Sequence, residues 1–142
     1  MSNRDLELIA ETRRALDAYS RGDFDAAVKN AHPEIELVPA GGQNPIKGAA
    51  QFRAWMEPDA FESQVAEPLD IRVVGNKVLV WTRTRIKGAG SGMDADFLGY
   101  VVWTYDEAGL NTRIEIYLPH QEAEALEAVG LTEFGIHPEP SS

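Results

Sequence analysis

The feature that most constrains the fold is a series of four strand-like segments in the second half of the 142-residue chain. They span residues 65–74, 78–87, 94–105 and 110–118. Apolar and polar side chains alternate along much of each segment, which is the period of a strand with one buried face. Short turns such as Gly75-Asn76 separate them, so we expect an antiparallel meander. The Gly-rich stretch 88–92 is expected to be a mobile hairpin loop.

Helical patterns dominate the chain before this meander. Apolar residues recur at three- and four-residue steps after Ser2 or Asn3 and end at Gly22, which predicts a long first helix. A short second helix follows Asp23, a short strand covers 35–38, and a third helix covers 48–57. The last helix opens at Pro119 and ends at Gly130.

Helices followed by a meander of strands favour the α+β class, with a strongly curved, mostly antiparallel sheet wrapped over the long first helix. We expect one domain over residues 1–131 and a loose tail over 132–142, which holds two prolines and a serine pair.

Composition excludes several classes of function. The chain is 44% apolar and 25% charged, with 13 Lys and Arg against 23 Asp and Glu, giving a formal net charge of -10. Such a surface repels phosphate backbones and anionic membranes, so neither nucleic acid nor a membrane is an expected partner. No signal peptide is recognisable, and no apolar run approaches the ~20 residues of a membrane span, so we expect a cytoplasmic protein. Cysteine is absent, which removes thiol nucleophiles and thiolate metal sites.

Several short motifs are spread over about 125 residues in a characteristic order. They are Tyr19 to Asp25, His32-Pro33-Glu34, Ile46-Lys47-Gly48, Thr82 to Arg85, Gly90-Ser91-Gly92, Val102-Trp103-Thr104, Arg113 to Tyr117 and Glu124 to Leu131. Through them the chain resembles the nuclear transport factor 2-like (NTF2-like) superfamily, and within it the SnoaL-like group. The resemblance implies a cone-shaped α+β barrel, usually dimeric, with one apolar pocket between the sheet and the helices.

The resemblance leaves the activity open. The superfamily includes ketosteroid isomerase, polyketide cyclases, scytalone dehydratase and limonene epoxide hydrolase, none of which needs a metal or organic cofactor, and also non-catalytic binding modules. The acidic and tyrosine positions of the isomerase fall near Ala15, Val38 and Val101, which are all apolar. Of the epoxide-hydrolase pattern only the arginine is matched, by Arg83. Glu115 lies one residue from the second carboxylate position, and a one-residue shift would turn it inward.

Strand alternation predicts the wall of the pocket. We expect Arg83 and Arg85 to share the inward face of their strand with Leu79 and Trp81. The other expected ligand-binding residues are apolar: Leu37, Phe52, Trp55, Met56, Phe97, Val101, Trp103 and Ile116. An apolar cavity with two guanidinium groups at one end suits a hydrophobic ligand that carries a carboxylate, enolate or carbonyl oxygen.

Each of these interpretations has a structural alternative. Arg83 and Arg85 can instead be solvated strand residues paired with Asp94 and Asp96. His120, at the start of the last helix, can act as an acid or base at the pocket mouth or simply lie at the surface. The three histidines show no metal-ligand spacing, so no metal is expected.

Two functions therefore remain open. One is a cofactor-free isomerase, cyclase or hydrolase that acts on a small apolar carbonyl compound. In it Arg83 would stabilise an oxyanion, Arg85 would orient the ligand, and Glu115 or His120 would move a proton. The other is a module that binds small molecules without catalysis. The outward face is too apolar for a free surface and therefore predicts a homodimer through the sheet; it comprises Leu98, Tyr100, Val102, Arg113, Glu115 and Tyr117.

Overall fold

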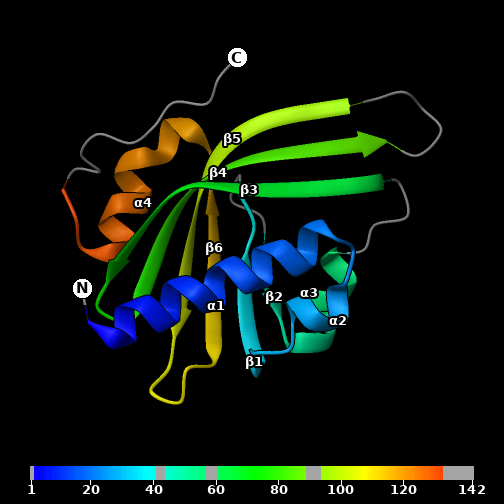
Figure 1. Ribbon diagram of the computed structural model, residues 1–142. Helices are drawn as coiled ribbons and strands as arrows, with labels where there is room; N and C mark the ends of the chain where they lie inside the picture. Colours follow the sequence, from blue (N-terminus) through cyan, green and yellow to red (C-terminus); the bar gives the residue numbers. More distant parts are fainter. Residues whose placement is uncertain (1, 41–43, 57–60, 89–93, 133–142) are drawn as a thin grey trace.

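The computed structural model describes residues 2–40, 44–56, 61–88 and 94–132, and Figure 1 shows their arrangement. The described elements are, in chain order, α1 (Asn3–Ser20), α2 (Phe24–Ala27), β1 (Ala31–Val38), β2 (Ile46–Lys47), α3 (Ala49–Met56), β3 (Phe61–Val74), β4 (Lys77–Gly88), β5 (Asp94–Tyr105), β6 (Asn111–Tyr117), the 3-10 turn η1 (Pro119–Gln121) and α4 (Glu122–Val129).

The helix ends follow the capping residues that the sequence offers. Ser2 accepts a hydrogen bond from the backbone N–H of Asp5 and the Asp5 side chain accepts one from the Ser2 backbone, which forms a capping box at the start of α1. Asp23 caps α2. Gly130 ends α4 with φ +81°, a left-handed conformation that glycine adopts without a Cβ penalty.

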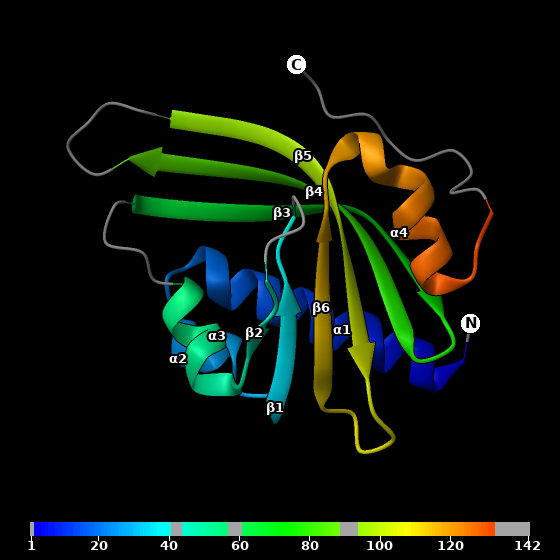
Figure 2. The ribbon, with the colours of Figure 1, turned by 180° about the vertical axis from the view of Figure 1, so that it is seen from behind.

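The sheet has the strand order β2-β1-β6-β5-β4-β3. Strands β3 to β6 form the predicted antiparallel meander, and β1 joins it by parallel pairing with β6. The sheet is strongly curved, and α1 lies across its concave face while α4 lies on the opposite face (Figures 1 and 2). The predicted α+β class, with N-terminal helices against a curved and mostly antiparallel sheet, is confirmed.

Each face of the sheet has its own hydrophobic core. The inner core joins α1, α3 and the concave face, and includes Leu16, Phe52, Val80 and Trp103. The outer core joins α4 to the convex face; its buried members are Leu79, Trp81, Tyr100, Val102, Ala125, Leu126 and Val129. This second core buries two of the six residues on which the dimer prediction depended. Tyr100 and Val102 are only 2% and 0% exposed within a single chain, so their apolar character is no evidence for a partner.

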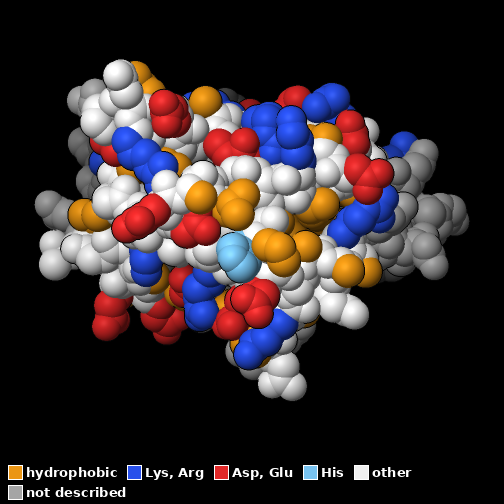
Figure 3. Space-filling view, turned by 90° about the horizontal axis from the view of Figure 1, so that it is seen from below, with side chains coloured by type: hydrophobic (Ala, Val, Ile, Leu, Met, Phe, Trp, Pro, Cys, Tyr) orange, Lys and Arg blue, Asp and Glu red, His pale blue; other side chains and the backbone are white. Residues whose placement is uncertain are grey.

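The described surface carries charges of both signs. On the face seen in Figure 3, acidic and basic side chains are interspersed around small apolar groups. No helix in the described parts of the chain is long and apolar enough to cross a membrane. The predicted tail from residue 133 onward and the predicted loop residues 89–92 lie outside the described residues.

Candidate functional site

A cavity of about 540 Å³ lies between the helices and the concave face of the sheet. This volume falls within the range of small-molecule sites. Most of its lining is apolar and comes from every layer around it. The lining residues are Ala15, Leu16, Tyr19, Ala27, Leu37, Pro39, Ala40, Phe52, Trp55, Met56, Gln64, Ala66, Thr82, Thr84, Ile86, Phe97, Leu98, Gly99, Tyr100, Val101, Trp103, Ile114, Ile116, Tyr117 and Leu118.

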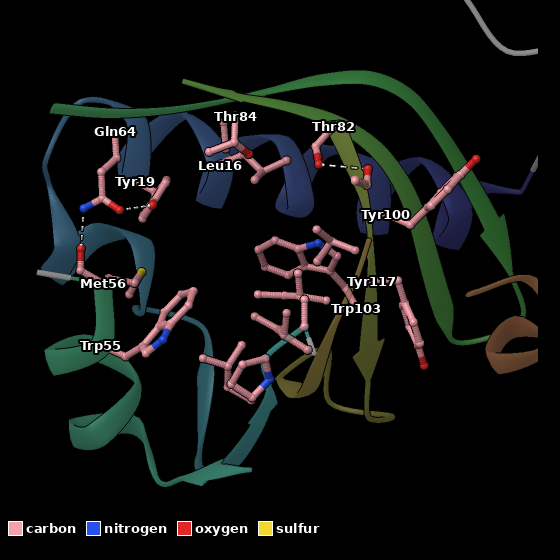
Figure 4. A pocket seen from close by; sticks show the side chains of 18 of the residues that line it. Leu16, Tyr19, Trp55, Met56, Gln64, Thr82, Thr84, Tyr100, Trp103 and Tyr117 are labelled. Atoms are coloured by element: carbon pink, nitrogen blue, oxygen red, sulfur yellow. Dashed lines mark hydrogen bonds between the residues drawn. The ribbon is translucent and has the colours of Figure 1, made fainter. Parts of the chain in front are cut away.

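Two tryptophans define the interior and the opening of the cavity (Figure 4). Trp103 of β5 is 7% exposed and belongs to the inner core, so it forms a fixed wall. Trp55 of α3 lines the cavity and is 40% exposed. Phe97 and Leu118 also line it, and they are 48% and 38% exposed. Residues that both line a cavity and meet solvent mark its rim, so these three side chains frame an apolar entrance.

Strand β4 contributes Thr82, Thr84 and Ile86 to the wall. The Thr82 hydroxyl donates to the carbonyl oxygen of Gly99 on β5, at 3.1 Å. Gly99 is required at this point because a Cβ there would lie 2.9 Å from the carbonyl oxygen of Tyr117. Strands β5 and β6 therefore lie very close together at Gly99, and this close approach fixes the position of the cavity wall beside Thr82.

One end of the cavity is polar and lies between α1, α3 and β3. The Tyr19 hydroxyl donates to Oε1 of Gln64 at 2.5 Å, and Nε2 of Gln64 donates to the Met56 carbonyl oxygen at 2.9 Å. Burial raises the pKa of Tyr19 to about 12, so the phenol is protonated at neutral pH. We call this linked set of Tyr19, Gln64 and the Met56 carbonyl the polar end (Figure 4).

The expected inward orientation of Arg83 and Arg85 is wrong. The cavity-lining residues of β4 are the even-numbered ones, so both arginines lie on the opposite face. Arg83 forms a two-pronged pair with Asp96, with Nε–Oδ1 2.9 Å and Nη2–Oδ2 2.7 Å, and Arg85 pairs with Glu67 at 2.8 Å. These bonds raise the pKa of Arg83 and lower that of Asp96. For Arg83 the structural alternative is therefore correct, because this arginine pairs with Asp96 outside the cavity.

Trp81 follows the same parity. It packs in the outer core, with its ring centroid 4.5 Å from that of Tyr100, and does not line the cavity. The sequence could not fix this parity, because residues 78–81 are apolar and buried on both faces. The alternating pattern assumes that only one face of a strand is buried, but the outer core under α4 buries the second face of β4 as well.

The two expected proton-transfer residues also lie away from the cavity. Glu115 is on the convex face, where it accepts from the Tyr117 hydroxyl at 2.7 Å and lies 3.3 Å from Nε of Arg113. Its neighbours Ile114 and Ile116 line the cavity instead, so the one-residue shift that would turn Glu115 inward does not occur. His120 is exposed in η1 and is not among the lining residues.

Eight of the expected ligand-binding residues do line the cavity. They are Leu37, Phe52, Trp55, Met56, Phe97, Val101, Trp103 and Ile116. The polar lining residues that the sequence reasoning missed include Tyr19, Gln64, Thr82 and Thr84. The opposite parity of β4 would have revealed the two threonines, but Gln64 stands in a segment with no signal that points to a site.

The described lining residues carry no ionisable group other than tyrosine hydroxyls. Among the described lining residues there is no Asp, Glu, His, Lys or Arg. Tyr100 and Tyr117 contribute to the lining, but their side chains point away from the other labelled residues in Figure 4, and their hydroxyls donate to Glu122 and Glu115. The described residues contain no group of three His, Asp or Glu side chains that could hold a metal ion. The arrangement can enclose an apolar molecule and offer it neutral hydrogen-bonding groups.

This combination of a curved α+β sheet and an enclosed apolar cavity defines an NTF2-like, cystatin-like fold. The family model of the SnoaL-like domain matches residues 12–114, and the chain belongs to that family. No curated protein matches the sequence.

Solved structures with low sequence identity share this fold. An NTF2-like protein of unknown function from Burkholderia pseudomallei K96243 has a TM-score of 0.69 at 16% identity, over 92% of this chain and 99% of that one. A putative SnoaL-like polyketide cyclase from Jannaschia sp. CCS1 has a TM-score of 0.73 at 16% identity, over 91% and 94%. A Mycobacterium tuberculosis protein in complex with estradiol-17β-hemisuccinate has a TM-score of 0.67 at 11% identity, over 76% and 90%.

Proposed function

We propose that the protein binds a small, neutral and largely apolar molecule in this cavity and does not transform it. The observation that carries the proposal is the absence of any Asp, Glu, His, Lys or Arg from the described lining of a 540 Å³ apolar cavity. Burying an unpaired charge in such a site is very costly, so the lining selects against charged ligands. General acid–base catalysis needs a group whose pKa lies near the working pH, and the described lining offers none.

The relatives support a molecule of polycyclic or aromatic size. One of them is a protein solved with a steroid ester, and another is a putative polyketide cyclase. The rim of Trp55, Phe97 and Leu118 fits the passage of a flat apolar ring system, because aromatic side chains pack well against such rings. The carbonyl or carboxylate group expected in the ligand loses its support, since the two arginines that suggested it lie outside the cavity.

The alternative function is a cofactor-free isomerase, cyclase or hydrolase, which the enzymes among the relatives favour. Tyr19 is the residue that such a reaction would use, because its hydroxyl belongs to the polar end. With its pKa raised to about 12 it cannot serve as a base near neutral pH, and it can donate a hydrogen bond to a developing oxyanion only by giving up its bond to Gln64. The reaction would therefore have to proceed without a protein base among the described lining residues.

A displacement assay separates the two functions. The neutral fluorescent probe N-phenyl-1-naphthylamine is first titrated into the protein and then displaced by estradiol and other neutral ring compounds. The same compounds, with a panel of epoxides, enones and esters, are incubated with the protein and analysed by mass spectrometry. Displacement with unchanged compounds supports the proposal. Turnover that the Tyr19→Phe variant loses would establish the enzyme instead, and failure of every compound to bind would refute both.

A further inference from the structure

The polar end retains hydrogen-bonding capacity after its internal bonds are made. The Tyr19 hydroxyl donates its single proton to Oε1 of Gln64, and the Gln64 amide donates one of its two N–H hydrogens to the Met56 carbonyl oxygen. These two bonds also fix the orientation of the amide, because its oxygen must face the phenol and its nitrogen must face Met56. These two hydrogen bonds therefore determine which donors and acceptors of the polar end remain available to a ligand.

A count of donors and acceptors shows what is left. A phenol oxygen that donates its proton still has lone pairs that can accept, and an amide NH₂ that uses one hydrogen still has a second to donate. No other described residue forms a hydrogen bond with the Tyr19 hydroxyl or the Gln64 Nε2. Both side chains line the cavity. The polar end thus keeps one acceptor, on the Tyr19 oxygen, and one donor, on the Gln64 amide, and both belong to side chains that line the cavity.

The ligand group that satisfies both is a hydroxyl, which donates to the Tyr19 oxygen and accepts from the Gln64 N–H. An ether or ketone oxygen can only accept, and a carboxylate would bring a charge into a lining that has no described cation. We infer that the polar end selects neutral ligands that carry a hydroxyl group, with Tyr19 and Gln64 as the residues that determine this specificity. The inference rests on the proposed binding function.

The test compares three compounds with the same ring system: 2-naphthol, 2-methoxynaphthalene and 2-naphthoate. Each compound is titrated at pH 7 into the wild-type protein loaded with N-phenyl-1-naphthylamine, and displacement of this probe is measured. One hydrogen bond is worth a factor of about 3 to 10 in affinity, so 2-naphthol is expected to bind about 3 to 10 times more tightly than its methyl ether. The naphthoate is expected to bind more weakly than both.

Two variants test the two groups, and two matched variants serve as controls. Tyr19→Phe removes the acceptor that only the hydroxyl can use, so it is expected to reduce the preference for naphthol to less than about twofold while the methyl ether binds as before. Gln64→Met removes the donor that both ligand oxygens can use, so it is expected to weaken the binding of both compounds. Gln51→Met changes an exposed glutamine outside the lining, and Tyr105→Phe removes a buried phenol hydroxyl that bonds Thr12 instead. Both should keep the preference. Thermal melting confirms that each variant is folded.

The outcomes separate this inference from the proposed function. If none of the three compounds binds the wild-type protein, the binding function itself fails and the inference fails with it. If naphthol and its ether bind equally well, the cavity binds ligands but the hydroxyl specificity is refuted. A preference that survives in Tyr19→Phe, or affinities for both compounds that Gln64→Met leaves unchanged, would also overturn the assignment. Loss of the preference in folded Tyr19→Phe, with weaker binding of both compounds to folded Gln64→Met, supports it.

Discussion

Enlarging a side chain on α1 tests whether the cavity has room for additional side-chain atoms. Ala15 lines the cavity, while Ala18 lies on the same helix, is 0% exposed and does not line it. Ala15→Leu adds three carbon groups, which at about 0.8 kcal/mol each contribute at most about 2.4 kcal/mol of apolar burial. Ordering the new side chain costs about 0.5 to 1 kcal/mol. We therefore expect the free energy of unfolding to rise by about 1 to 2 kcal/mol.

The same substitution at Ala18 should have the opposite sign. Overpacking a filled core typically costs about 1 to 3 kcal/mol, because neighbouring side chains must leave their rotamers. Ala10→Leu, at an exposed position of α1, controls for the change in helix propensity. Urea unfolding followed by the fluorescence of the three tryptophans measures all three variants. An equal loss of stability in Ala15→Leu and Ala18→Leu would show that the space beside Ala15 is not available, and would refute the cavity.

Three further predictions follow from the site. Replacing Arg83 or Arg85 by Gln should change ligand affinity by less than about twofold in the displacement assay, since an exposed ion pair outside the cavity contributes little; a tenfold loss would contradict the site. Affinity for a neutral ligand should be constant from pH 6 to 9, because the Tyr19 pKa of about 12 keeps the phenol protonated and its bond to Gln64 is lost only as the pH rises through that value; a titration step near pH 7 would reveal an unrecognised acid or base. The homodimer remains a prediction, now based on Val65, which is exposed on the same face of the sheet as Arg85, and light scattering should give twice 15.6 kDa; a mass of 15.6 kDa would refute it.

The order and type of the elements could be predicted from local chemistry. The segment 94–105 is a strand over its full predicted length, and the caps at Ser2, Asp23 and Gly130 lie where their side chains or backbone freedom require. The predicted inward residues of β5 are also correct, because Phe97, Val101 and Trp103 all line the cavity, although Leu98, Tyr100 and Val102 between them are apolar as well.

The face of β4 could not be predicted in the same way. Residues 78–81 are apolar throughout, since one side packs in the inner core and the other packs under α4. Beyond them threonine alternates with arginine, so both faces are polar and neither is marked as the interior. Only the tertiary position of α4 decides the question, and a resemblance to enzymes that carry an arginine on this strand favoured the wrong answer.

The polar end was hidden for a different reason. Tyr19 lies within the first predicted helix, but its partner Gln64 lies 45 residues further along the chain, on β3. A glutamine carries no titratable group, so no pattern in the sequence singles it out. Its role follows from the sheet curvature and the position of α3, which bring the Met56 carbonyl oxygen to its amide.

A crystal structure of the protein with 2-naphthol bound tests the central claim most directly. The account predicts electron density for one ring system between Trp103 and Trp55, with its hydroxyl oxygen within hydrogen-bond distance of Tyr19 and Gln64. Density on the convex face beside Arg83 and Arg85, or a cavity that stays without the compound at saturating concentration, would contradict it.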